Sequence, residues 1–575
     1  MNALGQDTMD GKRKPLRVVA AALGLATFTI VLWGLLPAET DDLDRVFCAS
    51  FALALAIFLV TLWGRVGLGF LVAGALAGCV WLAGSLKLAY LHEPLMGPDL
   101  RYFLDATTLD VIAHYPAMWH KCAAALAGAL ALAVLVWRLE SPGWWRGRAL
   151  WRRGAFSLLA LLPLAFTAWP QGPFRGVYDV RTWDFIDHAK LNPTTAFLSS
   201  LSRMHVTIPA YTLAAAAHYD WGSATIAAPT APTRYPNLVT VIEESTLNPH
   251  QWAICNVPRC TFPMFQPDPD TNATGPLRVH TYGGATWTSE FAFFAGMPHT
   301  LFGPAGVYAP YNLVPRMRES LPRQLKALGY RTIAIYPMPR DFVRAGNAYA
   351  DYGFDEFYDA TDLHLAWEST DADVVHSFEE VQRRERAKDD RPLFFMILTM
   401  HQHGPHDHPL DALPPPWNQS PLPALDARIN RNLGTYLFRL HESDGAIAEL
   451  RRFLFADGKP TVLVHFGDHH PSFDGLEMKL PSGLPQELHS EAWEVTYYRI
   501  DSNFDRAPFP HYAVLDLAYL AGLLLDVAEL PKDAYFEANT RLRERCEGRF
   551  VDCPSPAVMD SYLAHVFGQL HAFAE

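Results

Sequence analysis

The chain has two parts that differ in the pattern of hydrophobic and polar residues. Up to about residue 170, long apolar runs alternate with short polar segments. From residue 236, apolar runs of strand length alternate with segments of helical periodicity, and residues 171–235 form a connector that ends in the Pro-, Ala- and Thr-rich stretch IAAPTAPTRYP. This pattern predicts a transmembrane domain over residues 1–170, a connector with a linker over 171–235, and a further domain over 236–575.

The first part contains five apolar segments, at about residues 18–36, 46–63, 66–86, 122–137 and 155–169. A helix needs about 20 residues to cross the hydrocarbon core, with a usual range of about 17–25. The first three segments meet this length, and the last two reach it with their Trp-rich flanks, which are typical of the membrane interface. We therefore expect about five transmembrane helices. The alternatives are a buried soluble helix for the last segment and a signal peptide for the first.

The charges of the loops predict the orientation of these helices. Basic residues occupy one set of loops: Lys12, Arg13, Lys14, Arg17, Arg65, Arg138, Arg146, Arg148, Arg152 and Arg153. The alternate loops carry the acidic residues Glu39, Asp41, Asp42, Asp44, Glu93, Asp99, Asp105 and Asp110. The positive-inside rule then places the N-terminus in the cytoplasm and everything after residue 170 outside. We predict a multi-pass protein of the bacterial inner membrane with its large domain in the periplasm.

Composition and cysteine spacing agree with this location. The net charge of −13 comes from the part after residue 170, which argues against binding to nucleic acid. Two close pairs of cysteines, Cys255/Cys260 and Cys546/Cys553, fall in the predicted external part. Such pairs in an oxidising compartment indicate short-loop disulfides. A zinc site formed by all four cysteines is the alternative, although the spacing differs from that of zinc knuckles.

The second part is predicted to be an α/β domain. Its apolar runs NLVTVIEES, RTIAIYP, PLFFMILTM and PTVLVHF are separated by segments with helical period. Continuous apolar strands between helices indicate a mostly parallel sheet covered by helices on both faces. Ligands of such sheets bind beyond the carboxyl ends of the strands, so the polar residues at those ends are the candidates for chemistry.

Three of the predicted strands end in residues that bind metals. The first ends in EEST, which includes Glu244, and the last in GDHH, which includes Asp468 and His469. The middle strand runs into HQHGPHDH over residues 401–408. Carboxylates and imidazoles together form a set that zinc or manganese accepts. A solvated His-rich loop is the alternative for residues 401–408, and it is a weaker one for GDHH, because a buried Asp needs a partner.

A candidate nucleophile precedes a predicted helix in the segment TYGGATWTSEF. Two glycines are followed by Thr286, and the helix is expected to start at Thr288, Ser289 and Glu290. A hydroxyl near a helix N-terminus lies among backbone N–H groups that can hold a phosphate, and metal coordination would lower its pKa. The alternative role is an N-cap, which suits Thr288 or Ser289 better than Thr286. We therefore predict Thr286 as the nucleophile.

Several motifs, taken in order, resemble those of a known family. These are the ES pair after the first strand, GGAT…TSEF, GFDEFYD, HQHGP and GDHH. They resemble the lipoteichoic acid synthase and phosphoglycerol transferase branch of the alkaline-phosphatase (sulfatase-like) superfamily, to which phosphoethanolamine transferases are related. The resemblance extends to the EPLMGPDL loop and the five-span anchor. It implies a sulfatase-like α/β fold behind a membrane anchor.

The resemblance also implies a set of site residues. A divalent metal, Mn²⁺ or Zn²⁺, would be held by Glu244, Thr286, Asp468 and His469, with Thr286 also the nucleophile. Tyr336 stands where lipoteichoic acid synthases have a histidine, and the arginine that binds glycerol phosphate is displaced, which puts the head group in doubt. The candidate substrate-binding residues are His403, Arg340, Arg344 and His489.

The reaction implied by the resemblance is the transfer of a phospho-head group, with phosphoglycerol favoured. The donor would be a membrane phospholipid, the intermediate a phosphothreonine, and the acceptor a periplasmic glycan or lipid. One alternative is a phosphoethanolamine transferase acting on lipid A or a glycan. Another is a sulfatase-type hydrolase, because CNVPR at residues 255–259 comes close to the C/S-x-P-x-R pattern. A third is a non-catalytic membrane assembly factor, which the retention of all four metal-site residues opposes.

Overall fold

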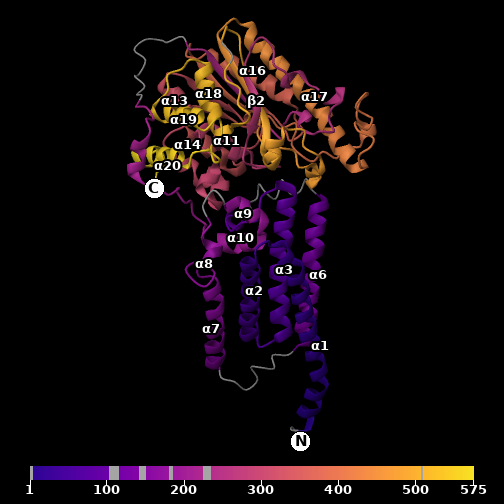
Figure 1. The fold of residues 1–575 in the computed structure, drawn as a ribbon. Helices are drawn as coiled ribbons and strands as arrows, with labels where there is room; N and C mark the ends of the chain where they lie inside the picture. Colours follow the sequence, from indigo (N-terminus) through magenta and orange to yellow (C-terminus); the bar gives the residue numbers. More distant parts are fainter. Residues whose placement is uncertain are drawn as a thin grey trace. The chain divides into compact units, whose positions relative to one another are not determined.

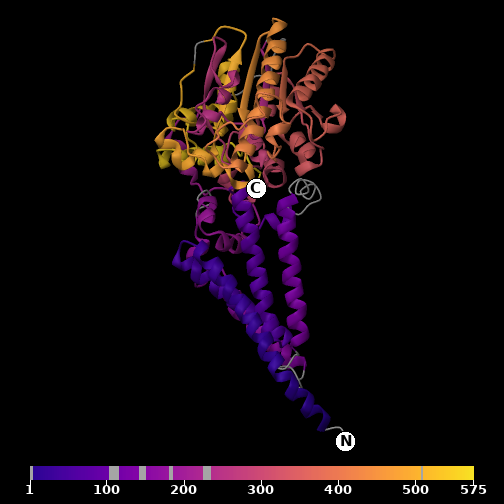
Figure 2. The same ribbon diagram turned by 90° about the vertical axis from the view of Figure 1, so that its right-hand side faces the viewer.

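A computed structural model describes residues 4–102, 116–140, 150–180, 185–223, 235–506 and 509–574 (Figures 1 and 2). The chain divides into two compact units, Met1–Met204 and His205–Glu575. Each unit has hydrophobic clusters of its own. Three predicted features lie outside the described residues: the part of the acidic loop with Asp105 and Asp110 at 103–115, the basic loop with Arg146 and Arg148 at 141–149, and the linker at 224–234.

The first unit is a set of long helices that run alongside one another (Figures 1 and 2). These are α1 (Leu4–Leu35), α2 (Asp42–Trp63), α3 (Val66–Leu91), α6 (Pro116–Leu139) and α7 (Leu150–Thr167). In the part of the chain that is described, four helices are long and apolar enough to cross a membrane, and α7 is not among them. Its 18 residues include Arg152 and Arg153 close to its start, which lower its hydropathy. The five-span arrangement therefore stays a prediction.

The connector divides between the two units. Its helices α8 (Arg175–Tyr178), α9 (Phe185–Leu191) and α10 (Pro193–Ser200) belong to the first unit, where α8 and α10 contact α2. Residues 205–223 belong to the second unit, in which Trp221 is buried and donates a hydrogen bond to Ser561. The short helix α4 (Asp99–Tyr102) follows the EPLM segment of the first unit.

The second unit is built on an eight-stranded sheet with the order β4-β3-β5-β1-β6-β7-β2-β8. Strand β7 is antiparallel to both of its neighbours, whereas the other neighbouring pairs are parallel. This arrangement confirms the predicted, mostly parallel sheet. The strands are β1 (Asn237–Glu243), β2 (Thr271–Arg278), β3 (Arg331–Ile335), β4 (Glu356–Tyr358), β5 (Leu393–Leu398), β6 (Thr461–Gly467), β7 (Val495–Ser502) and β8 (Leu515–Asp516).

Helices cover both faces of this sheet, as predicted. In the fully buried strand β5, Phe394 and Met396 join one hydrophobic cluster while Phe395 and Ile397 join the other, because side chains alternate along a strand. The second cluster is covered by α16 (Asp371–Arg386) and α17 (Ala427–Ala456). The first is covered by α11 (Thr286–Ala295), α13 (Leu321–Ala327), α14 (Ala345–Tyr352), α18 (Leu520–Val527), α19 (Ala534–Arg545) and α20 (Pro556–Leu563) (Figure 1). The short helices α12 (Ala309–Asn312) and α15 (Ala360–Leu363) lie in the connections.

The two cysteine pairs form disulfides, Cys255–Cys260 and Cys546–Cys553. Both lie in the second unit, and three of the four cysteines are completely buried. The predicted pairing is confirmed, and the alternative of one zinc site shared by all four cysteines is not what the structure contains.

The positive-inside prediction can be tested with reporter fusions. A reporter enzyme that is active only in the periplasm should be active when it is fused after residue 175. The same reporter fused near residue 148 should be inactive, because the basic loop is expected to stay in the cytoplasm. Equal activity at the two positions would contradict five spans.

Candidate active site

Two neighbouring parallel strands end side by side at the candidate site. Strand β1 pairs with β6 in a register that places Glu243 opposite Gly467. The next residues, Glu244 and Asp468, therefore emerge at the same edge of the sheet. Gly467 allows this approach, since a Cβ at that position would lie 1.7 Å from the carbonyl oxygen of Thr246. The pairing of the strands thus brings two carboxylates together.

The turn before α11 brings Thr286 to the same place. Gly283, Gly284 and Ala285 all have positive φ angles, of 66°, 159° and 65°. Helix α11 begins at Thr286 with Ala285 as its N-cap, so the predicted helix start at Thr288 is wrong. The Thr288 hydroxyl donates to the Ala285 carbonyl at 2.8 Å, as expected of a residue in the first turn. Thr286 follows Gly284 by two residues, is half-buried, and reaches Glu244 at the end of β1.

The structure brings Glu244, Thr286, Asp468 and His469 together. Thr286 Oγ1 donates to Glu244 Oε2 at 3.0 Å and lies 3.4 Å from His469 Nε2. His469 Nε2 lies 3.5 Å from Glu244 Oε1 and 3.3 Å from Asp468 Oδ2. Glu244, Asp468 and His469 are buried, and a ligand atom of each lies within 4.8 Å of the others. These four residues are called the Thr286 cluster below.

The electrostatics of the cluster favour a cation. Burial and the nearby Glu244 carboxylate raise the pKa of Asp468 well above its usual range. Burial also opposes charge on Glu244, but the pKa of this carboxyl is lowered below the ordinary value by the imidazoles of His469 and His403 when they are protonated, and by the hydroxyls of Ser245 and Thr286. Burial lowers the pKa of His469, which keeps its ring neutral and its nitrogen able to bind a metal. Two carboxylates in one buried place are both charged only if a positive charge joins them.

The donor atoms of the cluster fit a divalent metal. Asp468 Oδ1 accepts hydrogen bonds from the backbone N–H groups of Ser245 and His469, both at 2.7 Å. Asp468 Oδ2 is buried among the described residues without a hydrogen-bond partner, which is costly for a carboxylate oxygen. Carboxylate oxygens, an imidazole nitrogen and a hydroxyl oxygen form the mixed set that Mn²⁺ and Zn²⁺ accept.

Neighbouring groups hold the donors in place. The Ser245 hydroxyl donates to Glu244 Oε1 at 2.8 Å. His469 Nδ1 lies 3.0 Å from the carbonyl oxygen of His470, and donation there leaves Nε2 free to face the cluster. The Ser289 hydroxyl donates to the Asp468 carbonyl at 2.7 Å, which ties α11 to the end of β6. Ser245 and Ala285 have φ angles of 50° and 65°, and such strain in non-glycine residues is common at functional sites.

A buried carboxyl group that the sequence prediction did not include lies one turn along α11. Glu290 is 3% exposed, and burial, together with the charges of Asp468 and Glu244, raises its pKa to about 8. Its position four residues after Thr286, on the same face of a helix, was the signal that could have identified it. Burial and the nearby charge of Glu290 also raise the pKa of Tyr336, the residue that stands in place of the expected histidine.

Two residues of the predicted motifs, Glu243 and His470, lie beside the Thr286 cluster and do not join it. Glu243 accepts hydrogen bonds from Tyr497 at 2.6 Å and from His465 Nδ1 at 2.9 Å, on the other side of β1. His470 lies 3.1 Å from Glu477 and 2.8 Å from the Val495 carbonyl. Adjacent residues at the end of a strand point in different directions, so Glu243 and His470 serve the fold beside the site.

The predicted substrate-binding residues lie in different surroundings. His403 is half-buried and packs edge-on against Trp367, with 4.8 Å between the ring centroids. It is close enough to Glu244 to influence the pKa of that carboxyl. Arg340 is bound to the carboxylates of Asp359 and Asp362, both at 3.0 Å. Arg344 lies over the ring of Tyr311 at 5.5 Å, and the exposed His489 lies 2.8 Å from the Leu484 carbonyl. Within the described residues, no hydrogen bond or ion pair joins Arg340, Arg344 or His489 to the Thr286 cluster.

Removing one carboxylate should weaken metal binding at the cluster. We expect Asp468→Asn to weaken Mn²⁺ binding by at least about 100-fold, because loss of a direct ligand should cost more than loss of a residue that only orients one. Isothermal titration calorimetry of the full chain in detergent measures the affinity. The control is Asp444→Asn, which removes a carboxylate that caps the Met264 N–H at 2.7 Å, away from the cluster. Equal affinity in the two variants would contradict a metal at Asp468.

Comparison with known proteins agrees with this geometry. The sulfatase family model matches residues 236–501, from the start of β1 to the end of β7. An uncharacterised protein of Haemophilus influenzae is 31% identical over 348 residues, which cover 58% of this chain and 61% of that protein. A protein of Rhizobium meliloti, named for the modification of cyclic β-1,2-glucan, is 23% identical over 409 residues, covering 67% of this chain and 60% of that protein. The matches thus span about three fifths of the length of these curated relatives.

Among solved structures, the phosphoglycerol transferase of Streptococcus pyogenes in complex with sn-glycerol-1-phosphate is similar to this chain. The TM-score is 0.47 at 16% sequence identity, and the alignment covers 64% of this chain and 99% of that one. The match of residues 236–501 to the sulfatase family model agrees with the sulfatase-like α/β domain that the motifs of this segment predict.

Proposed function

We propose that this protein is a metal-dependent phosphotransferase. It moves a phospho-head group, with phosphoglycerol favoured, from a membrane phospholipid to a periplasmic glycan or lipid acceptor. The observation that carries the proposal is the Thr286 hydroxyl, which lies 3.0 Å from Glu244 Oε2 and 3.4 Å from His469 Nε2 at the start of a helix. A hydroxyl among metal-binding groups is the arrangement of an activated nucleophile.

The metal ligands in this proposal are Glu244, Asp468, His469 and the hydroxyl oxygen of Thr286, and the ion is Mn²⁺ or Zn²⁺. When bound, such an ion stabilises negative charge on phosphoryl oxygens and favours the ionised form of the hydroxyl. The unpartnered oxygen Asp468 Oδ2 supports this assignment, since a buried carboxylate oxygen needs a donor or a cation.

The reaction proceeds in two displacements. Thr286 Oγ1 forms a bond to the phosphorus of the lipid phosphodiester, and the bond from phosphorus to the diacylglycerol oxygen breaks. Glu244 Oε2 accepts the hydrogen bond that orients the Thr286 hydroxyl. The hydroxyl proton passes to water, and the departing diacylglycerol oxygen takes up a proton from water. An acceptor hydroxyl then attacks the phosphorus of the phosphothreonine, and the bond from phosphorus to Thr286 Oγ1 breaks. The acceptor's proton passes to water, and Thr286 Oγ1 takes up a proton from water. One phosphodiester is exchanged for another, so the transfer needs no nucleotide.

The N-terminus of α11 assists phosphate binding. The helix has ten residues and begins at Thr286 itself, so its free N–H groups and the positive end of its dipole point to the position of the phosphoryl group. His403, whose charge influences Glu244, is the candidate ligand for the phosphate oxygens on the other side. The neutral Tyr336 replaces an imidazole in this region, and we infer that it contacts the head group.

A lipid donor and an external location agree with the rest of the chain. Four apolar helices are able to hold the protein in a membrane, which keeps it where phospholipids are. The two disulfides favour an oxidising compartment for the second unit, as expected for the periplasm. A glycan acceptor is supported by the name of the Rhizobium meliloti relative, which refers to a glucan.

Substitution of the nucleophile tests this function. We expect Thr286→Ala to reduce diacylglycerol release from phosphatidylglycerol vesicles by about 10³-fold or more, because it removes the attacking atom of a covalent mechanism. Thr286→Ser retains a hydroxyl and should keep measurable activity. Thr288→Ala is the matched control, since its hydroxyl donates to the Ala285 carbonyl at 2.8 Å in the first turn, and loss of one such hydrogen bond should cost about 1 kcal/mol of stability.

Two outcomes would contradict the assignment. Near wild-type release by Thr286→Ala, with loss in Thr288→Ala, would show that the wrong hydroxyl was chosen. If the wild type shows no metal-dependent release of diacylglycerol from either phosphatidylglycerol or phosphatidylethanolamine vesicles, the proposal that the protein is a phosphotransferase is wrong. Faster release from phosphatidylethanolamine would replace phosphoglycerol by phosphoethanolamine as the head group.

A further inference from the structure

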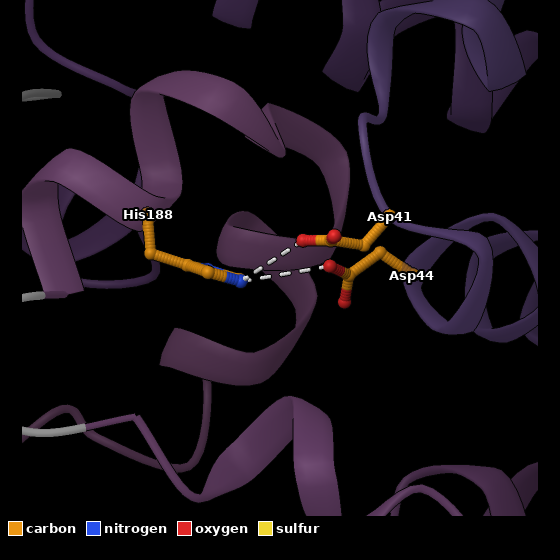
Figure 3. A group of neighbouring side chains, drawn as sticks. All are labelled: Asp41, Asp44 and His188. Carbon is orange, nitrogen blue, oxygen red and sulfur yellow. Dashed lines mark ion pairs between the residues drawn. The ribbon is translucent and has the colours of Figure 1, made fainter.

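A second group of metal-binding side chains lies in the first unit, apart from the Thr286 cluster (Figure 3). Asp41 is the N-cap residue of α2, Asp44 lies in the first turn of that helix, and His188 comes from α9 of the connector. The imidazole and the two carboxylates point toward one another, as Figure 3 shows. Nothing in the reaction proposed above uses these three residues.

The distances between these side chains match the spacing of ligands around a shared ion better than the length of a hydrogen bond. His188 Nε2 lies 3.5 Å from Asp44 Oδ2 and 3.8 Å from Asp41 Oδ2. A hydrogen bond from nitrogen to oxygen has a length of about 2.7–3.2 Å, so both distances are too long for one. Two ligand atoms at about 2.0–2.1 Å from one tetrahedral zinc ion lie about 3.4 Å apart. The three ligand atoms all lie within 4.8 Å of one another, which is close enough for one ion to bind among them.

Buried polar residues hold the three ligands in this arrangement. Asn192, which is completely buried, accepts the N–H groups of Thr40 and Asp41 at 2.8 and 3.4 Å. Its amide nitrogen donates to Asp41 Oδ2 at 3.3 Å and to the His188 carbonyl at 3.4 Å, and it lies 3.4 Å from His188 Nε2. One side chain thus positions ligands from both α2 and α9, which is the role of the outer partners of a metal site.

The exposure of the ligands also suits an ion. The side chain of Asp44 is 4% exposed, and burial of a carboxylate is costly without a cation or strong hydrogen bonds. The side chains of Asp41 and His188 are 61% and 27% exposed, so an ion can reach the group from solvent. Within the described residues, this set and the Glu244, Asp468 and His469 set are the two places where such groups converge.

We propose that Asp41, Asp44 and His188 bind a divalent cation, with Zn²⁺ the best match to one imidazole and two carboxylates. The ion joins the N-terminal end of α2 to α9, and so attaches the connector to the membrane helices. Three protein ligands would leave one position of a tetrahedral ion open to water. The site does not depend on the reaction assigned to the Thr286 cluster.

Zinc content of the full chain tests the proposal. The protein is purified in detergent, treated with a chelator, dialysed against Zn²⁺, and analysed for zinc by atomic spectroscopy. We expect two zinc ions per wild-type chain and one in His188→Ala. Asp41→Asn should also bind one, and it keeps the size and exposed position of the side chain, so it tests the site even if His188→Ala is unstable. Asp468→Asn should lose the other ion.

The matched control is Asp42→Asn. Asp42 is next to Asp41, its side chain is 95% exposed, and its carboxylate pairs with Arg45 at 2.8 Å instead of facing His188. This variant should keep two zinc ions. The proposal would be overturned if the wild type binds no more zinc than His188→Ala, or if both His188→Ala and Asp41→Asn bind two zinc ions. His188 and Asp44 would then form a plain ion pair. Because each ion is assigned by its own variant, failure here leaves the Thr286 cluster untouched.

Discussion

The close approach of two buried carboxylates, Glu244 and Asp468, is the constraint on which the catalytic unit depends. It follows from the parallel pairing of β1 and β6, which places Glu243 opposite Gly467 and so brings the next residue of each strand to one edge. Two carboxylates buried there are unfavourable unless a cation joins them. The backbone donors to Asp468 and the neutral His469 are arranged as such a cation requires. The proposed binding of a metal and activation of Thr286 would thus follow from the pairing of β1 with β6.

Much of the second unit could be predicted from the sequence, because apolar runs and strand ends are local properties. The fully buried strands and the residues that follow β1 and β6 lie where the pattern predicts them, and Glu244, Thr286, Asp468 and His469 converge. The helix start was missed since it depends on the left-handed backbone of Ala285, which propensity does not reveal. The approach of His188 to the start of α2 could not be predicted, because it depends on a tertiary contact between distant segments.

The first unit and the second have different physical requirements, and the proposed function uses both. Four helices of the described residues are long and apolar enough to cross a membrane, and the proposed transfer from one phosphodiester to another would proceed there without a nucleotide. The disulfides Cys255–Cys260 and Cys546–Cys553 suit a unit that works outside the reducing cytoplasm. The connector belongs partly to each unit, and a zinc ion at His188 would stabilise the part that contacts the membrane helices.

Direct detection of the covalent intermediate tests the central claim most sharply. The full chain is incubated with metal and phosphatidylglycerol vesicles without an acceptor, quenched in acid, digested, and analysed by tandem mass spectrometry. The account predicts a phosphoglycerol group on the peptide that contains Thr286, localised to that residue, and none in Thr286→Ala. Modification of Thr288 or Ser289 instead, or diacylglycerol release with no modified peptide at any time point, would contradict a mechanism that passes through Thr286.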